Sequence, residues 1–125
     1  MKTIKNIGVL TSGGDSPGMN AAIRAVVRAG VFHNLNVFGY RRGYEGLVQN
    51  DCFKMERQSV ANIIQRGGTI LKTARCDSFR SPEGREIAYK NLKENNIDAL
   101  VVIGGDGTFT GAHVFEQEFD LPIIG

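Results

Sequence analysis

The sequence has few of the residues that crosslink or stiffen a small protein: no tryptophan, three prolines and two cysteines in 125 residues. Cys52 and Cys76 stand apart, without further cysteines or histidines at the spacing of a metal site. Two such residues do not make the disulfide framework of a small secreted protein. We therefore expect two free thiols in a reducing compartment, and a cytoplasmic protein.

Long apolar runs are also missing. The longest, Ala99–Ile103, is far shorter than the roughly 20 residues that a membrane helix needs, and Ile7–Leu10 is too short for the core of a signal peptide. Neither sign of charge dominates, since 15 Lys and Arg against 13 Asp and Glu leave a net charge of +2. We therefore expect no membrane or nucleic-acid partner, and a small anionic ligand held locally.

Glycine is the abundant residue, with 16 of 125 positions against a usual share of about 7%. The glycines stand beside apolar segments, in clusters near residues 13–18, 39–46, 67–68 and 104–111. With 42% hydrophobic residues, the chain has the composition of one globular domain or part of one. Such clusters indicate loops in which the backbone approaches a ligand closely.

Apolar periodicity predicts strands that alternate with helices. Strands are expected at 4–10, 36–40, 52–55, 97–103 and 121–125, helices at 19–31, 59–65, 83–95 and 108–118, a loop at 43–46, and a loop with short helical pieces at 69–84. Ser59 is the expected N-cap of the second helix. This pattern predicts an α/β fold, Rossmann-like, with a parallel sheet flanked by helices on both faces in three layers, α/β/α. Ligands of such sheets bind beyond the carboxyl ends of the strands, where two of the glycine clusters fall.

The first loop, Thr11–Gly18, joins the first expected strand to a helix. Its glycines let amide groups approach a phosphate, and the helix N-terminus favours negative charge. A tight strand-to-helix turn without a ligand is the alternative. The loop is neither a Walker loop nor G-x-G-x-x-G.

The second loop, Gly104–Thr108, places Asp106 among three glycines just past a buried strand. The carboxylate is suited to Mg²⁺ held against polyphosphate oxygens. The alternative is that Asp106 is only the N-cap of the next helix.

Together, three elements resemble the bacterial type of ATP-dependent 6-phosphofructokinase, in order and over essentially all 125 residues. They are Thr11-Ser12-Gly13-Gly14-Asp15 with Pro17-Gly18-Met19-Asn20, Gly67-Gly68-Thr69 with Thr73-Ala74-Arg75, and Gly104-Gly105-Asp106-Gly107-Thr108. The last element is shared with NAD kinases and lipid kinases of related fold. The first two make the resemblance specific.

The resemblance implies a nucleotide site. ATP phosphates would lie on Gly14 and Mg²⁺ on Asp106, and Arg75 would stabilise charge on the transferring phosphoryl group. The remaining residues implied to bind the nucleotide are Tyr44, Cys76, Gly105, Gly107, Thr108 and Gly111. From the residues alone Arg75 could be an ordinary surface residue, but the local excess of Lys and Arg over residues 66–85 indicates an anion site.

The resemblance also implies allosteric regulation in a homotetramer. Arg24, Arg28 and Arg57 match arginines that bind a regulatory nucleotide diphosphate or acidic metabolite at a subunit interface. Without the resemblance, Arg24 and Arg28 would be a solvated helix face. No role is implied for Lys72.

The implied activity is ATP-dependent phosphorylation of fructose 6-phosphate to fructose 1,6-bisphosphate, a glycolytic transferase reaction. Residues 1–125 are expected to be the N-terminal nucleotide-binding portion, inactive alone, because the sugar-phosphate contacts and the Thr-x-Asp loop with the catalytic base would follow Gly125. Two rivals remain open. A pyrophosphate-dependent relative typically has Asp where Gly107 stands, and a non-catalytic NADP-binding module would use Arg41 and Arg42.

Overall fold

The computed structural model describes residues 3–13, 18–63, 68–74 and 76–125, with only the main chain of Asp106. Its centre is a five-stranded sheet in the order β3-β2-β1-β4-β5. The strands are β1 (Asn6–Thr11), β2 (Asn36–Tyr40), β3 (Cys52–Met55), β4 (Ala99–Ile103) and β5 (Ile123–Ile124). β1 is parallel to both β2 and β4, and β4 is parallel to β5.

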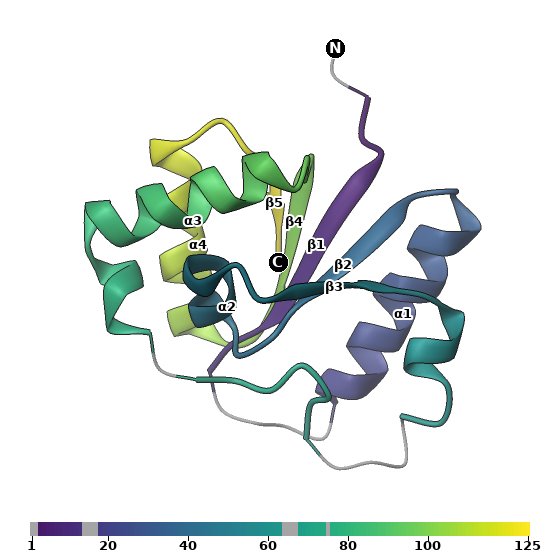
Figure 1. Ribbon diagram of the computed structural model, residues 1–125. Helices are drawn as coiled ribbons and strands as arrows, with labels where there is room; N and C mark the ends of the chain where they lie inside the picture. The colour runs from purple at the N-terminus through teal and green to yellow at the C-terminus, as the bar shows by residue number, and fades with distance from the viewer. Residues whose placement is uncertain (1–2, 14–17, 64–67, 75) are drawn as a thin grey trace.

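Helices cover both faces of this sheet (Figure 1). They are α1 (Met19–Phe32), α2 (Tyr44–Gln49), α3 (Pro82–Glu94) and α4 (Asp106–Glu118), with the 3-10 helices η1 (Arg57–Val60) and η2 (Asp77–Arg80). Neighbouring residues of a strand point to opposite faces, so Val9 packs in a core with α1 and η1, and Leu10 in a core with α2, α3 and α4. The predicted α/β/α layering is confirmed.

One edge of the sheet departs from the prediction, because β3 pairs with β2 in the antiparallel direction. The connection over residues 41–51 is shorter than the roughly one dozen residues that a parallel crossover needs. It also contains α2, where a loop over Gly43–Gly46 was expected. Gly43 has φ +60°, and a side chain on Gly46 would overlap the carbonyl oxygen of Arg41, so these glycines let the chain turn sharply into a helix.

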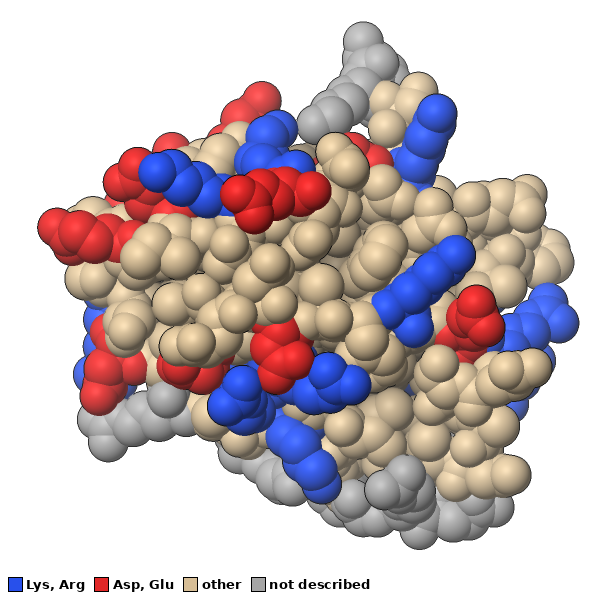
Figure 2. Space-filling model, in the orientation of Figure 1, with Lys and Arg blue, Asp and Glu red and all other residues tan. Residues whose placement is uncertain are grey.

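The expected helix starts at Ser59, Glu83 and Thr108 are each one or two residues too late, since the helices begin at Arg57, Pro82 and Asp106. The segment after β3 forms the short helix η1, and the amide of Glu56 donates to Ser59 Oγ at 2.9 Å, so Ser59 is the third residue of a capping box and not an N-cap. Helix α3 begins at Pro82 with Ser81 as its N-cap. On the face seen in Figure 2, acidic and basic side chains are interspersed over α3. Lys90 and Glu86 of this helix form an ion pair at 3.9 Å.

The carboxyl ends of β1 and β4 lie side by side. Thr11 pairs with Ile103, and the amide of Ser12 continues the pairing by donating to the Ile103 carbonyl at 2.9 Å. The described parts of the two glycine-rich loops therefore meet at one edge of the sheet, as the sequence predicted. In the part of the chain that the structure describes, no helix combines the length and the apolar character of a membrane span.

Candidate nucleotide site

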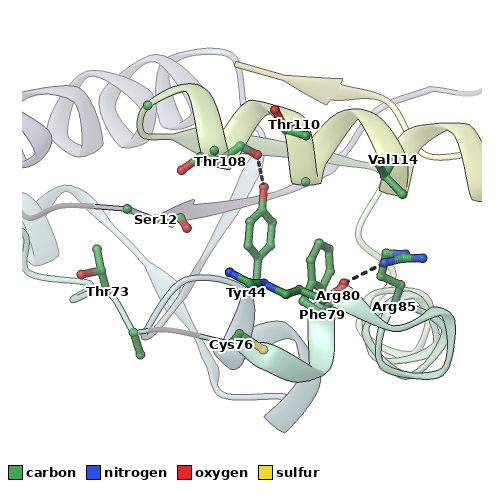
Figure 3. A pocket seen from close by; sticks show the side chains of 15 residues that line it. Ser12, Tyr44, Thr73, Cys76, Phe79, Arg80, Arg85, Thr108, Thr110 and Val114 are labelled. Carbon is green, nitrogen blue, oxygen red and sulfur yellow. Dashed lines mark hydrogen bonds between the residues drawn. The ribbon is translucent and has the colours of Figure 1, made fainter.

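A cavity of about 810 Å³ opens at this carboxyl edge. It runs from Ser12 and Thr73 at one end to Arg85 and Val114 at the other (Figure 3). Its walls come from the loops that follow β1 and β4, from α2, from η2 and the segment before it, from the start of α3, and from α4. The volume lies within the range of about 300–1,000 Å³ usual for small-molecule sites.

An aromatic stack forms one wall of the cavity. The rings of Tyr44 and Phe79 are nearly parallel, with centroids 4.1 Å apart, and Phe115 packs at a tilt on Phe79. Tyr44 Oη donates a 2.6 Å hydrogen bond to the carbonyl of Thr108 (Figure 3). Burial raises the pKa of Tyr44, so the phenol stays protonated and donates. Helix α2 is thereby fastened to the first turn of α4.

The hydroxyl of Thr108 is unusual. Thr108 is 4% exposed, and among the described residues its Oγ1 is the one buried side-chain polar atom without a hydrogen-bond partner. A buried polar atom left unpaired costs about 1–3 kcal/mol, which indicates that a ligand belongs there. A Cβ on Gly104 would overlap this hydroxyl and lie 2.5 Å from the Ser12 carbonyl oxygen, so the glycine is needed for the close approach of the two loops.

The N-terminus of α4 provides the electrostatic character of the site. Its N-cap is Gly105 and its first residue is Asp106, so the alternative in which Asp106 itself is the N-cap is wrong. The first amides of a helix have no partner within the helix and favour an anion. Gly105 and Gly107 have open space where a Cβ would stand, which leaves these amides accessible.

The residues around α4 also fit a magnesium ion. Mg²⁺ is usually held by one or two carboxylates together with substrate phosphates, and a threonine hydroxyl is a suitable oxygen donor. Asp106 and the unpaired hydroxyl of Thr108 belong to the same helical turn. The described residues contain no group of three His, Cys, Asp or Glu side chains that could hold a metal alone. This chemistry therefore suits a metal brought in with polyphosphate.

The segment before η2 contributes Thr73, Ala74 and Cys76 to the wall. Burial, and then the nearby Glu45 side chain, raise the pKa of the Cys76 thiol to about 11. The Cys76 thiol is consequently neutral at physiological pH. Both cysteines are free, as expected from the sequence.

Arg80 and Arg85 line the cavity, Arg80 beside Tyr44 and Phe79 and Arg85 at the far end (Figure 3). Arg85 forms an ion pair with Glu118 on α4, and its Nη1 donates to the Phe79 carbonyl at 3.0 Å. Glu118 raises the pKa of Arg85, and Arg85 lowers that of Glu118, so both remain charged. The sequence pointed to these two arginines only through the local excess of positive charge.

Most predicted nucleotide residues that the structure describes converge on this cavity. Its lining includes Tyr44, Cys76, Gly105, Gly107, Thr108 and Gly111. Gly14 and Arg75 lie outside the described residues, as does the side chain of Asp106. Sequence reasoning assigned no ligand role to Phe79, Thr110 or Val114, since nothing local distinguishes an aromatic wall from a core residue.

The predicted effector residues lie elsewhere. Arg24 and Arg28 are on α1, across the sheet from α4, and Arg57 lines a second cavity of about 480 Å³ with Lys54 and Asn34. Neither Arg24 nor Arg28 is among the described residues that line this second cavity. The three arginines are therefore not gathered in one cavity.

The observation that suggested an NADP site has a structural explanation. Arg41 and Arg42 each form an ion pair with Asp51 at 3.0 Å, and Arg41 also lies over the Phe53 ring. Burial opposes ionisation of Asp51, but hydrogen bonds from the two arginines hold its pKa below the usual value. Both guanidinium groups already have a carboxylate partner, which removes the argument that they await a 2′-phosphate.

The fold and this site define an α/β protein with a candidate anion site at a helix N-terminus. Among solved structures, the chain resembles Pichia pastoris phosphofructokinase in the T-state, with a TM-score of 0.90 and 48% identity over 94% of this chain and 14% of that one. A pyrophosphate-dependent phosphofructokinase from Marinobacter aquaeolei shares the fold, with a TM-score of 0.82 and 20% identity over 96% of this chain and 32% of that one.

Sequence comparison makes the assignment specific. The family described as "Phosphofructokinase" matches residues 6–125. The chain is 62% identical over its whole length to ATP-dependent 6-phosphofructokinase 2 of Bacteroides thetaiotaomicron, of which it covers 38%. The chain belongs to the phosphofructokinase family, as the sequence motifs predicted. It spans less than two fifths of the length of that relative.

Proposed function

We propose that residues 1–125 are the N-terminal nucleotide-binding portion of a cytoplasmic ATP-dependent 6-phosphofructokinase. This glycolytic transferase would move the γ-phosphoryl group of ATP to fructose 6-phosphate and form fructose 1,6-bisphosphate. The observation that carries the proposal is the convergence of Tyr44, Thr108 and the glycines of α4 on one cavity at a helix N-terminus. The ATP-dependent relative, identical at 62% of positions, supports the same donor.

In this proposal each part of the cavity has a role in ATP binding or phosphoryl transfer. The amides at the start of α4 and the Gly14 loop bind phosphate oxygens, and Arg75 stabilises charge on the transferring group. Tyr44 keeps the first turn of α4 in place through its bond to the Thr108 carbonyl. Asp106 and the Thr108 hydroxyl would hold Mg²⁺, which when bound neutralises charge on the phosphates. The wall that contains Phe79 excludes water.

The direct test is a coupled assay on the longer protein in which this chain forms the N-terminal portion. Turnover of fructose 6-phosphate is expected with ATP, and the 125-residue chain alone should show none. General-base assistance is worth about 10²–10⁴-fold, and the proposed base lies outside these residues. Turnover with pyrophosphate but not with ATP would contradict the proposed donor.

Gly107 is proposed to keep space for the nucleotide. Gly107→Asp should raise the KM for ATP strongly, because the site has open room at this position and an acidic side chain would fill it and repel phosphate. Steady-state kinetics with ATP and with pyrophosphate measure the effect. Gly107→Ala, which adds volume without charge, is the matched control. An unchanged KM for ATP in Gly107→Asp would place donor choice elsewhere.

We further propose that Arg24, Arg28 and Arg57 bind an allosteric nucleoside diphosphate or acidic metabolite in a homotetramer. Arg24→Ala and Arg28→Ala should leave the maximal velocity nearly unchanged and abolish the effector response, since a distinct site can be lost without the catalytic one. Velocity measured against effector concentration checks this. Lys90→Ala, which removes an exposed cation of α3, should respond normally. Equal loss of velocity and regulation would refute the effector role.

A further inference from the structure

Three of the four buried polar side chains among the described residues belong to the segment Gly68–Ala74 or bond to it. The buried polar side chains among the described residues are Thr11, Asn20, Thr69 and Thr108. Thr108 is the unpaired ligand group discussed above. The other three come from β1, from α1 and from the segment Gly68–Ala74, and each is at most 2% exposed. None of these three is among the residues that line the cavity.

Two of these residues form a chain of hydrogen bonds with a defined direction. Thr11 Oγ1 donates to the carbonyl of Lys72 at 3.0 Å and lies 3.0 Å from Thr69 Oγ1. A hydroxyl has one proton, so with that of Thr11 directed at Lys72, the proton between the two hydroxyls comes from Thr69. Thr69 Oγ1 in turn accepts from the amide of Leu71 at 3.1 Å. Each of the two hydroxyls therefore donates and accepts.

Asn20 fixes the same segment from the side of α1. Its Oδ1 accepts from the amide of Ile70 at 2.7 Å, and its Nδ2 donates to the carbonyl of Ile63 at 3.2 Å. The side chain is thus bonded to main-chain groups on both sides of residues 64–67. Because Asn20 is completely buried, either bond would be costly to lose without a replacement.

The hydrogen bonds act at a point where the backbone is strained. Lys72 has φ +64°, a conformation that residues with a Cβ seldom adopt. Its carbonyl is held by Thr11, and the neighbouring Leu71 carbonyl accepts from the amide of Arg42 at 2.8 Å. The next residues, Thr73 and Ala74, line the cavity. The path of the wall segment therefore depends on the conformation of Lys72.

We propose that Thr11, Asn20 and Thr69 form a positioning frame for the wall residues Thr73, Ala74 and Cys76, and that they contribute to phosphoryl transfer without touching the nucleotide. The inference rests on the proposed function, in which Arg75, the residue between Ala74 and Cys76 in the sequence, stabilises the transferring phosphoryl group. A displacement of about 1 Å in a positioned group can cost about 10²-fold in rate. Loss of the frame should therefore lower kcat more than it changes the KM for ATP.

The first test uses Thr11→Val, which keeps the shape of the side chain and removes the hydroxyl. In the longer protein we expect kcat to fall by about 10- to 100-fold, with a much smaller change in the KM for ATP. Thr11→Ser should restore most of the activity. Thr69→Val is the second variant if Thr11→Val does not fold. Asn95→Ala is the control, since Asn95 bonds Asn50 and Tyr40, and neither of these lines the cavity.

The second test asks whether the frame acts through Lys72. Glycine adopts positive φ without strain, so Lys72→Gly should restore part of the kcat lost in Thr11→Val. Lys72→Ala removes the long side chain but keeps the Cβ, and it should restore nothing. Because glycine at a positive φ also raises stability, kcat is compared per mole of folded protein, and a frame that only adds stability would leave this kcat equal for glycine and alanine. Equal effects of the two substitutions would overturn the proposal.

Hydrogen exchange separates this inference from the proposed function. The Leu71 amide, which donates to Thr69 Oγ1, should exchange faster in Thr11→Val than in Asn95→Ala, whether or not the protein is an active kinase. Unchanged exchange at Leu71 would refute the frame. Absence of wild-type turnover, with the Leu71 effect present, would refute the proposed function and leave the frame supported.

Discussion

Asp106→Asn in the longer protein is expected to lower kcat by about 10²–10³-fold while the fold remains intact. Asp106 is the first residue of α4 and belongs to the same turn as Thr108, whose buried hydroxyl has no hydrogen-bond partner. Asparagine keeps the size of the side chain and removes the charge that would hold Mg²⁺ against polyphosphate. Because Gly105 is the N-cap, the substitution removes no N-cap residue.

The measurement is kcat as a function of Mg²⁺ concentration, with circular dichroism as the check on folding. Asp120→Asn is the matched control, because it makes the same change of charge at an exposed position beyond α4. That control should retain wild-type kinetics. Wild-type turnover of Asp106→Asn at saturating Mg²⁺ would contradict the metal assignment, and a general loss of folding would show that Asp106 is structural.

Gly84→Ala is the second substitution with a large expected effect, and helix propensity alone predicts its sign incorrectly. Alanine in a helix is favoured over glycine by about 1 kcal/mol, so the sequence suggests stabilisation of α3. In the structure, a Cβ on Gly84 would lie 2.5 Å from the carbonyl carbon of Ser78 and overlap its oxygen. That oxygen accepts from Ser81 Oγ at 2.9 Å and from the Ser81 amide, so it cannot move freely.

We therefore expect Gly84→Ala to lower the free energy of unfolding by about 1–3 kcal/mol, the usual cost of overpacking. Urea unfolding measures the change in midpoint. Gly107→Ala is the control, because Gly107 is also in the first turn of a helix but has open space around the added Cβ. Its stability should be unchanged or slightly higher. If Gly84→Ala instead raises the free energy of unfolding, the predicted overpacking is contradicted. In that case η2, which carries Phe79, moves at little cost to make room for the added Cβ.

Local pattern was sufficient for much of the fold. The continuous apolar run at Ala99–Ile103 predicted a strand buried on both faces, and β4 contributes to both cores. The apolar spacing from Met19 predicted α1, whose residues Ile23 and Val27 are fully buried. The glycine clusters after β1 and β4 predicted loops at a shared edge, because parallel strands place their carboxyl ends together.

The candidate site could be predicted only in part. The glycine motifs marked the start of α4, because the need for close backbone approach leaves a local signature. The contact of Tyr44 with Thr108 joins residues 64 positions apart, and the stack of Tyr44 on Phe79 is also long-range. Tyr44 entered the prediction through family resemblance alone. The role of Phe79 depends on its packing against Phe115 of α4, and that of Arg85 on the ion pair between α3 and α4, which no short segment encodes.

The sequence by itself determined the alternation of strands and helices, the two glycine-rich loops and the family, since each of these depends on local backbone preference or on residue identity. Tertiary structure decided the antiparallel edge at β3, the isolation of the Thr108 hydroxyl and the frame around Lys72. These features arise from steric exclusion and hydrogen bonding between segments that are distant in the chain. These contacts and hydrogen bonds form only when the folded sheet has brought the segments together.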